Sequence, residues 1–522
     1  MNTIIHRALL LTTFLASALH AATPAPPNLV VILADDLGFG DVSCFNPASK
    51  IATPHIDRLA REGIRFTDAH TASSVCTPTR YALLTGRYPW RTRVQKSVLG
   101  GFSPPLIAPG RLTLASLLQH QGYTTAAVGK WHLGMTWPTR DGARFSDRIQ
   151  GRENDAAEHM SQVDWQRSIP DGPLAFGFNS FFGIAASLDM PPYGFIRDDR
   201  IAPAPTMEKK WIRTGPATAD FEAEDVLPAL TRHAVDWLDR RARENKPFFL
   251  YLPLTSPHTP ILPAGEFRGK SNLTAYGDFV IATDDAVGKV LDALERNGLA
   301  ENTLVIVTSD NGCSPAADVK ELLAKGHSPS GPWRGFKADI WEGGHRVPFV
   351  ARWPARIRAG STSDQTITLG DLVATAAEFT GTALPDDSAE DSVSFLPALL
   401  SKPAVTSPRT ATVQHSIDGK FAVRQGDWKL AFCPGSGGWS HPRDEAAVAQ
   451  GLPPVQLYNL AADPGETKNL ALAQPERVAQ LTAVMERIIA DGRSTPGQPQ
   501  RNDAPVNLFK KIVSDIPNPR DE

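Results

Sequence analysis

Two pairs of oxygen-bearing side chains stand directly behind apolar runs that are typical of buried strands. Asp35 and Asp36 follow one run, and Asp310 and Asn311 follow another. Carboxylates held close together repel one another, and a divalent cation relieves that repulsion. Because every ligand here offers a hard oxygen atom, the set favours calcium or magnesium over zinc. Two unrelated turns are the competing interpretation, since adjacent acidic residues are common.

A cysteine lies at the predicted start of a short helix, in the sequence SSVCTPTR at 73–80. The helix is expected to close at Gly86, and Arg80 follows Cys76 after one helical turn. The positive end of a helix attracts anions and lowers the pKa of a thiol. The pattern therefore predicts a reactive Cys76 with a depressed pKa, and a buried, inert cysteine is the alternative.

The elements that must position these groups alternate between helices and buried strands. Predicted helices cover 53–63, 113–122, 221–244 and 275–297, and predicted strands cover 28–34, 124–128, 248–254 and 304–308. The alternation predicts an α/β fold whose large, mostly parallel sheet is sandwiched by helices. Ligands of such sheets bind beyond the carboxyl ends of the strands. Four predicted strand ends carry charged or polar side chains, which favours one shared site: Asp35-Asp36, Lys130 with His132, His258, and Asp310-Asn311.

The alternation of helices and buried strands ends at about Leu400. Short β-like runs at 410–414, 421–424 and 428–432 are separated by tight turns and predict antiparallel strands, and 474–492 predicts an amphipathic helix. We therefore expect a signal peptide at 1–22, a catalytic domain at 23–400, a smaller C-terminal α+β subdomain at 401–500 and a polar tail at 501–522.

The N-terminus resembles a secretory signal peptide. A basic start precedes the apolar stretch 8–19, which is too short to span a bilayer, and the small residues Ala21 and Ala22 offer a cleavage site. A buried N-terminal helix is the rival interpretation. We expect an exported protein, periplasmic or secreted, with no membrane span.

Composition narrows the function classes. Hydrophobic residues make up 42% of the 522 residues and charged residues 21%, which is typical of a globular protein. The formal net charge of −3 argues against binding nucleic acid through its phosphates. Four cysteines are too few for a disulfide framework, and their spacing matches no zinc motif: Cys44, Cys76, Cys313 and Cys433.

The segment CTPTR at 76–80, followed by LTGR at 84–87, resembles the signature of the sulfatase family. Similar segments follow in the family's order: GKWHLG at 129–134, SPH at 256–258, SDNG at 309–312, GFK at 335–337, WEGG at 341–344, VP at 347–348, LYNL at 457–460 and DP at 463–464. The resemblance covers roughly 28–469 without a departure at the catalytic positions. It implies an alkaline phosphatase-like fold and a sulfuric ester hydrolase similar to bacterial polysaccharide and aryl sulfatases.

The resemblance also implies a modified nucleophile. Cys76 would be oxidised to formylglycine by a maturation enzyme, and its hydrated aldehyde would attack sulfur. One calcium ion would be bound by Asp35, Asp36, Asp310 and Asn311 together with the modified Cys76, and Asp310 would help to deprotonate the nucleophile.

The remaining family positions carry charge and protons. Arg80, Lys130 and Lys337 would neutralise the sulfate oxygens as charge builds. His258 would protonate the leaving alcohol, and His132 would take the second proton of the hydrate, which expels sulfate and restores the aldehyde.

Specificity is harder to derive from the sequence. Ser187 falls where related sulfatases contact the sulfate, and 183–193 resembles bacterial enzymes that act on sulfated polysaccharides. The loop 435–439 carries a tryptophan that can stack on a sugar. We expect a sulfated carbohydrate substrate, with galactose or N-acetylgalactosamine sulfate as the first choice; the alternative is that these residues only shape loops. The predicted substrate contacts are Ser187, Asp189, His327 and Arg334.

Two other functions stay open. A phosphomonoester or phosphonate hydrolase of the same superfamily would share the sheet, but two-metal phosphatases need additional His and Asp ligands. A non-catalytic sulfated-glycan binding protein would have a decayed site, but neither Cys76, Arg80 nor a metal ligand is missing.

Overall fold

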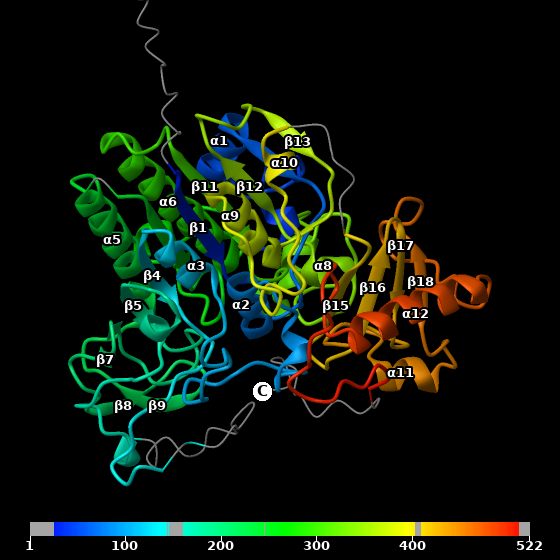
Figure 1. Ribbon diagram of the computed structural model, residues 1–522, viewed down its shortest axis with the longest axis horizontal. Coiled ribbons are helices and arrows are strands. Elements are labelled where there is room, and N and C mark those ends of the chain that lie inside the picture. Colours follow the sequence, from blue (N-terminus) through cyan, green and yellow to red (C-terminus); the bar gives the residue numbers. More distant parts are fainter. Residues whose placement is uncertain (1–25, 144, 146–159, 245, 402–408, 511–522) are drawn as a thin grey trace, which may run out of the picture.

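A ten-stranded sheet forms the centre of the protein in a computed structural model that describes residues 26–143, 145, 160–244, 246–401 and 409–510 (Figure 1). The strand order is β13-β2-β12-β11-β1-β10-β4-β5-β6-β7. The five central strands are parallel: β11 (Thr303–Ser309), β1 (Asn28–Ala34), β10 (Phe248–Pro253), β4 (Thr124–Lys130) and β5 (Ser180–Ile184). The predicted α/β fold with a mostly parallel sheet is confirmed.

The edges of this sheet depart from the parallel pattern. Strand β12 (Phe349–Arg352) runs antiparallel to β11, and β2 (Ile64–Phe66) runs antiparallel to β12. The outermost strands are β13 (Ser361–Ser363) on one side and β6 (Ile196–Arg197) with β7 (Arg200–Ile201) on the other. These strands are two to four residues long, and such short segments have no distinctive sequence periodicity.

Helices cover both faces of the sheet because alternate side chains of each strand point to opposite sides. Leu29, Val31 and Leu33 of β1 pack with α2 (Cys76–Thr85), α3 (Leu114–His120) and α9 (Leu372–Thr380). Val30 and Ile32 pack with α1 (Pro54–Glu62), α5 (Ala223–Arg241) and α6 (Ala275–Arg296). The four long helices predicted from the sequence agree with the structure to within a few residues at each end.

Two glycines help to position helix α2 and strand β4, which carry predicted site residues. Gly86 adopts φ = 65°, and its N–H donates to the Ala82 carbonyl at 2.8 Å, which ends α2 in the left-handed cap that glycine favours. Gly129 has φ = 141°, and a Cβ atom there would lie 1.8 Å from the carbonyl oxygen of Pro253. Strand β4 therefore approaches β10 closely just before it delivers Lys130.

The C-terminal part forms a separate four-stranded antiparallel sheet, which lies to the right of the main sheet in Figure 1. Its order is β15 (Thr412–His415), β16 (Phe421–Gln425), β17 (Trp428–Ala431) and β18 (Gln456–Asn459), and α12 (Pro475–Ala490) packs against it. Strand β18 was not predicted because four residues carry too little periodicity. The other short elements are α7 (Val319–Ala324), α8 (Glu342–His345), α10 (Leu396–Leu399), α11 (Asp444–Ala449), the pair β3 (Ala69–His70) and β14 (Ile367–Thr368), and the hairpin β8 (Met207–Lys210) and β9 (Thr214–Ala217).

The start of the predicted polar tail contacts the main domain through Asp503. Arg87 Nη1 donates to Asp503 Oδ2 at 3.0 Å, and the Asp503 N–H donates to the Arg91 carbonyl at 2.7 Å. The predicted signal peptide at 1–22 and residues 511–522 lie outside the described residues, and the domain boundaries stay predictions. All four cysteines are free. Among the described helices, none combines the length and the apolar character that crossing a membrane requires.

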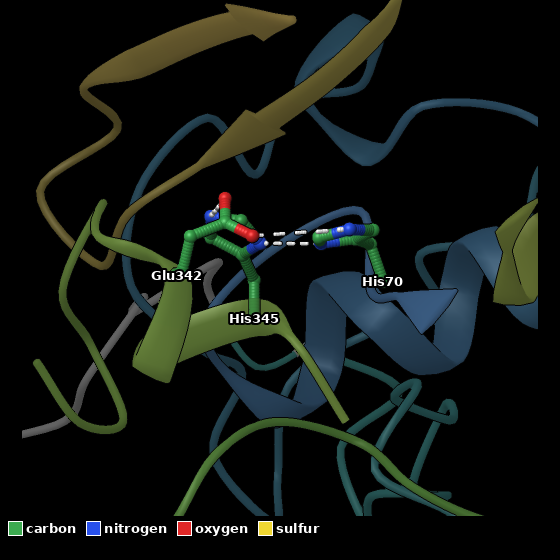
Figure 2. Close-up of side chains that lie close together, drawn as sticks. All are labelled: His70, Glu342 and His345. Atoms are coloured by element: carbon green, nitrogen blue, oxygen red, sulfur yellow. Dashed lines mark hydrogen bonds and ion pairs between the residues drawn. The ribbon is translucent and has the colours of Figure 1, made fainter. Parts of the chain in front are cut away.

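A buried group of charged side chains joins the C-terminal sheet to the main domain. Figure 2 shows His70, Glu342 and His345 side by side, a composition that can hold a metal ion. Lys429 Nζ from β17, however, donates to Glu342 Oε1 at 3.0 Å and to His345 Nε2 at 3.1 Å, and it lies 2.8 Å from Glu466 Oε1. The Lys429 ammonium thus takes the position of a cation, and the cluster is an ion network that ties α8 to β17.

Replacing Lys429 by methionine should lower the free energy of unfolding by about 3–5 kcal/mol, because Glu342 and Glu466 would stay buried without their shared cation. Chemical denaturation followed by circular dichroism measures the change. Lys289→Met is the matched control, since Lys289 is 53% exposed beside Asp285 on α6 and should matter by less than about 1 kcal/mol. Equal stability of Lys429→Met and the unchanged protein would contradict the role of the network.

Candidate active site

The carboxyl ends of four parallel strands meet at one edge of the sheet, and the side chains predicted to form the site lie there. The Asp310 N–H donates to the Ala34 carbonyl at 3.1 Å, and the Asp36 N–H donates to Asp310 Oδ1 at 3.2 Å. Lys130 ends β4, and His258 follows β10 after five residues. The structure therefore brings together side chains that lie up to 276 positions apart in the sequence.

Three carboxylates and three cations form the centre of this site. All six side chains are buried. The ion pairs are Arg80–Asp310 at 2.6 Å, Lys130–Asp35 at 2.7 Å and Lys337–Asp36 at 2.6 Å. Buried charges are tolerated when they are paired in this way. With all six groups ionised their charges sum to zero, so a cation and an anion can enter together with little change in net charge.

The carboxylate side of the site has the donors that a hard cation needs. Asn311 Nδ2 donates to Asp36 Oδ1 at 2.7 Å and to the Gly312 carbonyl at 2.9 Å. Within the described part of the chain, Asn311 Oδ1 and Asp35 Oδ1 are buried and accept no hydrogen bond, which a bound cation would explain. Burial and the nearby Asp35 charge raise the pKa of Asp310 to about 7. A cation would counter both effects, so the residues fit a calcium-like ion.

The backbone is strained next to three of these groups. Asp36 has φ = 70°, His132 has φ = 54° and Ala338, beside Lys337, has φ = 81°. Residues other than glycine occupy this left-handed region at a cost of about 1–3 kcal/mol each. Such positions persist where the surrounding contacts fix them, which is typical of functional sites.

Cys76 is the first residue of α2 and is 2% exposed. Burial raises the pKa of the Cys76 thiol, even though Lys130 and Lys337 act to lower it. The depressed pKa predicted from the sequence is therefore wrong: desolvation outweighs the helix terminus and the cations. An unmodified thiol at this place is a poor nucleophile at neutral pH.

His132 is held as a neutral proton acceptor. Its Nε2 lies 2.6 Å from the Leu99 carbonyl, so Nε2 carries the proton and donates it, while Nδ1 has no hydrogen-bond partner among the described residues. Burial, Lys130 and Arg80 hold the pKa of His132 well below its usual value. A bare Nδ1 on a neutral ring can accept a proton.

His258 presents its other nitrogen to the site. Nδ1 donates to the Thr259 carbonyl at 2.6 Å, and Nε2 lies 3.5 Å from Ser187 Oγ and 3.8 Å from Asp36 Oδ2. Ser187 in turn accepts from Lys130 Nζ at 2.6 Å. The predicted contact Ser187 therefore lies inside the charged centre, between a lysine and a histidine.

Asp189 lies on the outer side of His258. One oxygen, Oδ2, is paired with Arg213, which stands between β8 and β9. The other, Oδ1, is 4.0 Å from His258 Nδ1, is buried, and accepts no hydrogen bond from any described residue. Sequence reasoning missed Arg213, since a single arginine in a turn 24 positions away carries no signal.

Two predicted sugar contacts lie elsewhere. His327 is fully buried, and its Nε2 and Nδ1 are bonded to Asp41 and to the Lys50 N–H. The Arg334 guanidinium stacks 3.5 Å from the centre of the Trp341 ring and donates to a backbone carbonyl. His327 is therefore not accessible to a sugar, because proximity to Lys337 in sequence does not fix the direction of a loop. Arg334 is only partly buried, and its predicted contact with the sugar stays a prediction. Trp439, in contrast, packs against the small apolar cluster that contains Cys76.

Comparisons with known proteins identify the family and the relatives of this chain. Residues 27–382, more than half of the chain, match the family model described as sulfatase. An N-acetylgalactosamine-6-O-sulfatase of Bacteroides thetaiotaomicron is 32% identical, with 88% of this chain and 93% of the relative covered, and a steryl-sulfatase of Rattus norvegicus is 36% identical over 73% and 72%. A solved Bacteroides thetaiotaomicron structure, described with the metabolism of multiple glycosaminoglycans, has a TM-score of 0.76 at 31% identity and covers 89% of this chain and 99% of that one.

Replacing Asn311 by leucine should weaken calcium binding by roughly tenfold or more, because one oxygen ligand is lost while the ion pairs keep their charges. Isothermal titration calorimetry with calcium chloride on chelator-treated protein measures the affinity. Asn297→Leu is the control, since Asn297 follows α6 at the opposite edge of the sheet. Unchanged affinity in Asn311→Leu would exclude this residue from the cation site.

Proposed function

The chain belongs to the sulfatase family and hydrolyses sulfate esters, and we propose that its substrate is a carbohydrate that carries the ester at O6 of N-acetylgalactosamine or galactose. The observation that carries this proposal is the similarity to the N-acetylgalactosamine-6-O-sulfatase of Bacteroides thetaiotaomicron, which extends over 88% of this chain and 93% of that protein. The steryl-sulfatases of Rattus norvegicus and Mus musculus leave more of their own length unmatched, with 72% and 82% covered.

The surroundings of the site also suit a sugar better than a steroid. The Asp189 oxygen beside His258 is buried and needs a hydrogen-bond donor, which a sugar hydroxyl supplies and an apolar leaving group does not. Trp439 borders the same site and offers an aromatic face to a sugar ring.

The proposed nucleophile is formylglycine derived from Cys76 by a maturation enzyme. Its hydrate would supply a hydroxyl nucleophile, and one bound calcium ion would supply a positive charge against the sulfate oxygens. Asp35, Asp36, Asp310 and Asn311 would hold the ion. Burial opposes ionisation of the unmodified thiol, so its conversion to an uncharged hydrate suits this position.

The chain's own side chains would bind the anion and move the protons. Arg80, Lys130 and Lys337 would hold the sulfate oxygens in exchange for their present carboxylate partners. His258 would donate a proton from Nε2 to the leaving oxygen, and because its Nδ1 already donates to the Thr259 carbonyl, this step needs the doubly protonated ring. His132 would accept a proton at its bare Nδ1.

Export is part of the same proposal. We infer that residues 1–22 direct the protein to the periplasm or the exterior, where sulfated glycans are met. This placement agrees with a substrate that is too polar to cross a membrane unaided.

Protein produced with a formylglycine-generating enzyme should release sulfate from 6-sulfated N-acetylgalactosamine faster than from the 4-sulfated sugar. Ion chromatography measures the sulfate, and peptide mass spectrometry checks that residue 76 has lost its thiol. Cys76→Ala is the inactive control. Activity confined to a steroid sulfate or to a phosphate monoester would overturn the carbohydrate assignment.

Replacing Asp189 by alanine should lower kcat/KM for the sugar sulfate by about 10- to 150-fold, which corresponds to a charged hydrogen bond of about 1.5–3 kcal/mol. A chromogenic aryl sulfate lacks the hydroxyl and should be affected much less. Asp199→Ala, which removes an exposed partner of Arg200, serves as the control. Equal losses on both substrates would mean that Asp189 acts on His258 or on the scaffold and does not contact the sugar.

A further inference from the structure

The loop that carries His327 is pressed against the loop that carries the cation ligands. The Gly40 N–H donates to the Pro329 carbonyl at 2.7 Å. A Cβ atom at Gly38 would lie 2.2 Å from the Pro329 oxygen, and one at Gly40 would lie 2.1 Å from the Ser328 oxygen. The two backbones are thus in direct contact just beyond Asp36.

Asp41 is the centre of a buried hydrogen-bond relay behind Asp36. Its Oδ2 accepts from the Gly38 N–H at 2.7 Å and from the Tyr276 hydroxyl, and its Oδ1 faces His327 Nε2 at 2.8 Å. The Tyr276 hydroxyl also lies 3.0 Å from the Asp36 carbonyl oxygen. Asp41, Tyr276 and His327 are all buried. Two contacts of Asp41 therefore reach the Asp36 backbone, since Tyr276 lies at the Asp36 carbonyl and Gly38 follows Asp36 after two residues.

The proton on His327 is fixed by a backbone group. The Lys50 N–H donates to His327 Nδ1 at 3.2 Å, so Nδ1 carries no proton in the neutral ring. The ring proton is then on Nε2 and points at Asp41. His327 is consequently a directed donor to the Asp41 carboxylate.

We propose that His327 is a positioning residue for the cation-binding loop: through Asp41 and Tyr276 it holds Asp36 in the conformation that binds calcium. This inference rests on the calcium site of the proposed function. Asp36 needs such support because its φ of 70° is one that residues other than glycine rarely adopt. Partners of metal ligands orient those ligands, and their loss typically weakens metal binding by about 10- to 100-fold.

Two substitutions at His327 separate donation from packing. The amide nitrogen of His327→Gln lies near the position of Nε2 and keeps a donor for Asp41, whereas the amide oxygen of His327→Asn lies near Nδ1 and keeps only the acceptor for Lys50. Calcium chloride is titrated calorimetrically into chelator-treated full-length protein. We expect affinity within about threefold of the unchanged protein for His327→Gln, and about 10- to 100-fold weaker binding for His327→Asn.

Tyr276→Phe tests the same relay without altering the loop of His327. It removes the hydroxyl that bridges Asp41 and Asp36, and it should weaken calcium binding to a similar degree. Combined with His327→Asn, it should cost less than the product of the two single losses, because both act through Asp41. His233→Asn on α5 is the control and should bind calcium normally.

The outcomes distinguish this inference from the function on which it rests. If the unchanged protein binds no calcium, the proposed calcium site is wrong and the inference falls with it. If the unchanged protein binds calcium but His327→Gln and His327→Asn behave alike, His327 acts only by packing and the inference is overturned. Should His327→Asn fail to fold, normal calcium binding by Tyr276→Phe would overturn it instead.

Discussion

The pairing of three buried carboxylates with three buried cations is the constraint on which the rest of the site depends. Asp35 and Asp310 stand at the ends of neighbouring parallel strands, and Arg80 and Lys130 reach them from α2 and β4. Removing one partner leaves an isolated buried charge, which costs about 3–5 kcal/mol. The strand register and the position of α2 therefore depend on the same ion pairs that line the site for a cation and an anion.

The third pair extends this dependence to the C-terminal sheet. Lys337 stands on a loop whose backbone is bonded on both sides: its N–H donates to the Cys313 carbonyl at 2.9 Å, and the Ala338 N–H donates to the Ser74 carbonyl at 2.9 Å. A few residues later the chain enters α8, which Lys429 anchors through Glu342. A lysine of the second sheet thus helps to fix the segment that carries a lysine of the site.

The sequence predicts the parts of this molecule that rest on local patterns. The long apolar runs before Asp35 and Asp310 are strands, and because parallel strands end at one edge their polar termini meet. The structure differs where the outcome depends on distant contacts. His327 is a neighbour of Lys337 in sequence but faces Asp41, 286 positions away. Arg213 contacts Asp189 from the β8–β9 hairpin, whose short strands have no distinctive sequence periodicity.

The pKa of Cys76 shows the same limit and gives a physical reason for the proposed modification. A helix start and two lysines would lower the pKa of an exposed thiol, but those cations are already paired with carboxylates and the thiol is almost completely desolvated. A thiolate would therefore be an uncompensated buried charge. An uncharged hydroxyl nucleophile would avoid that charge until the sulfate and a cation arrive and Asp310 helps to deprotonate it. The bare Nδ1 of His132 would accept the proton of the second hydroxyl, which expels the sulfate. Reactivity at this position would then depend on substrate binding, because the cations that would stabilise the reacting oxygen are paired with carboxylates until a sulfate replaces these partners.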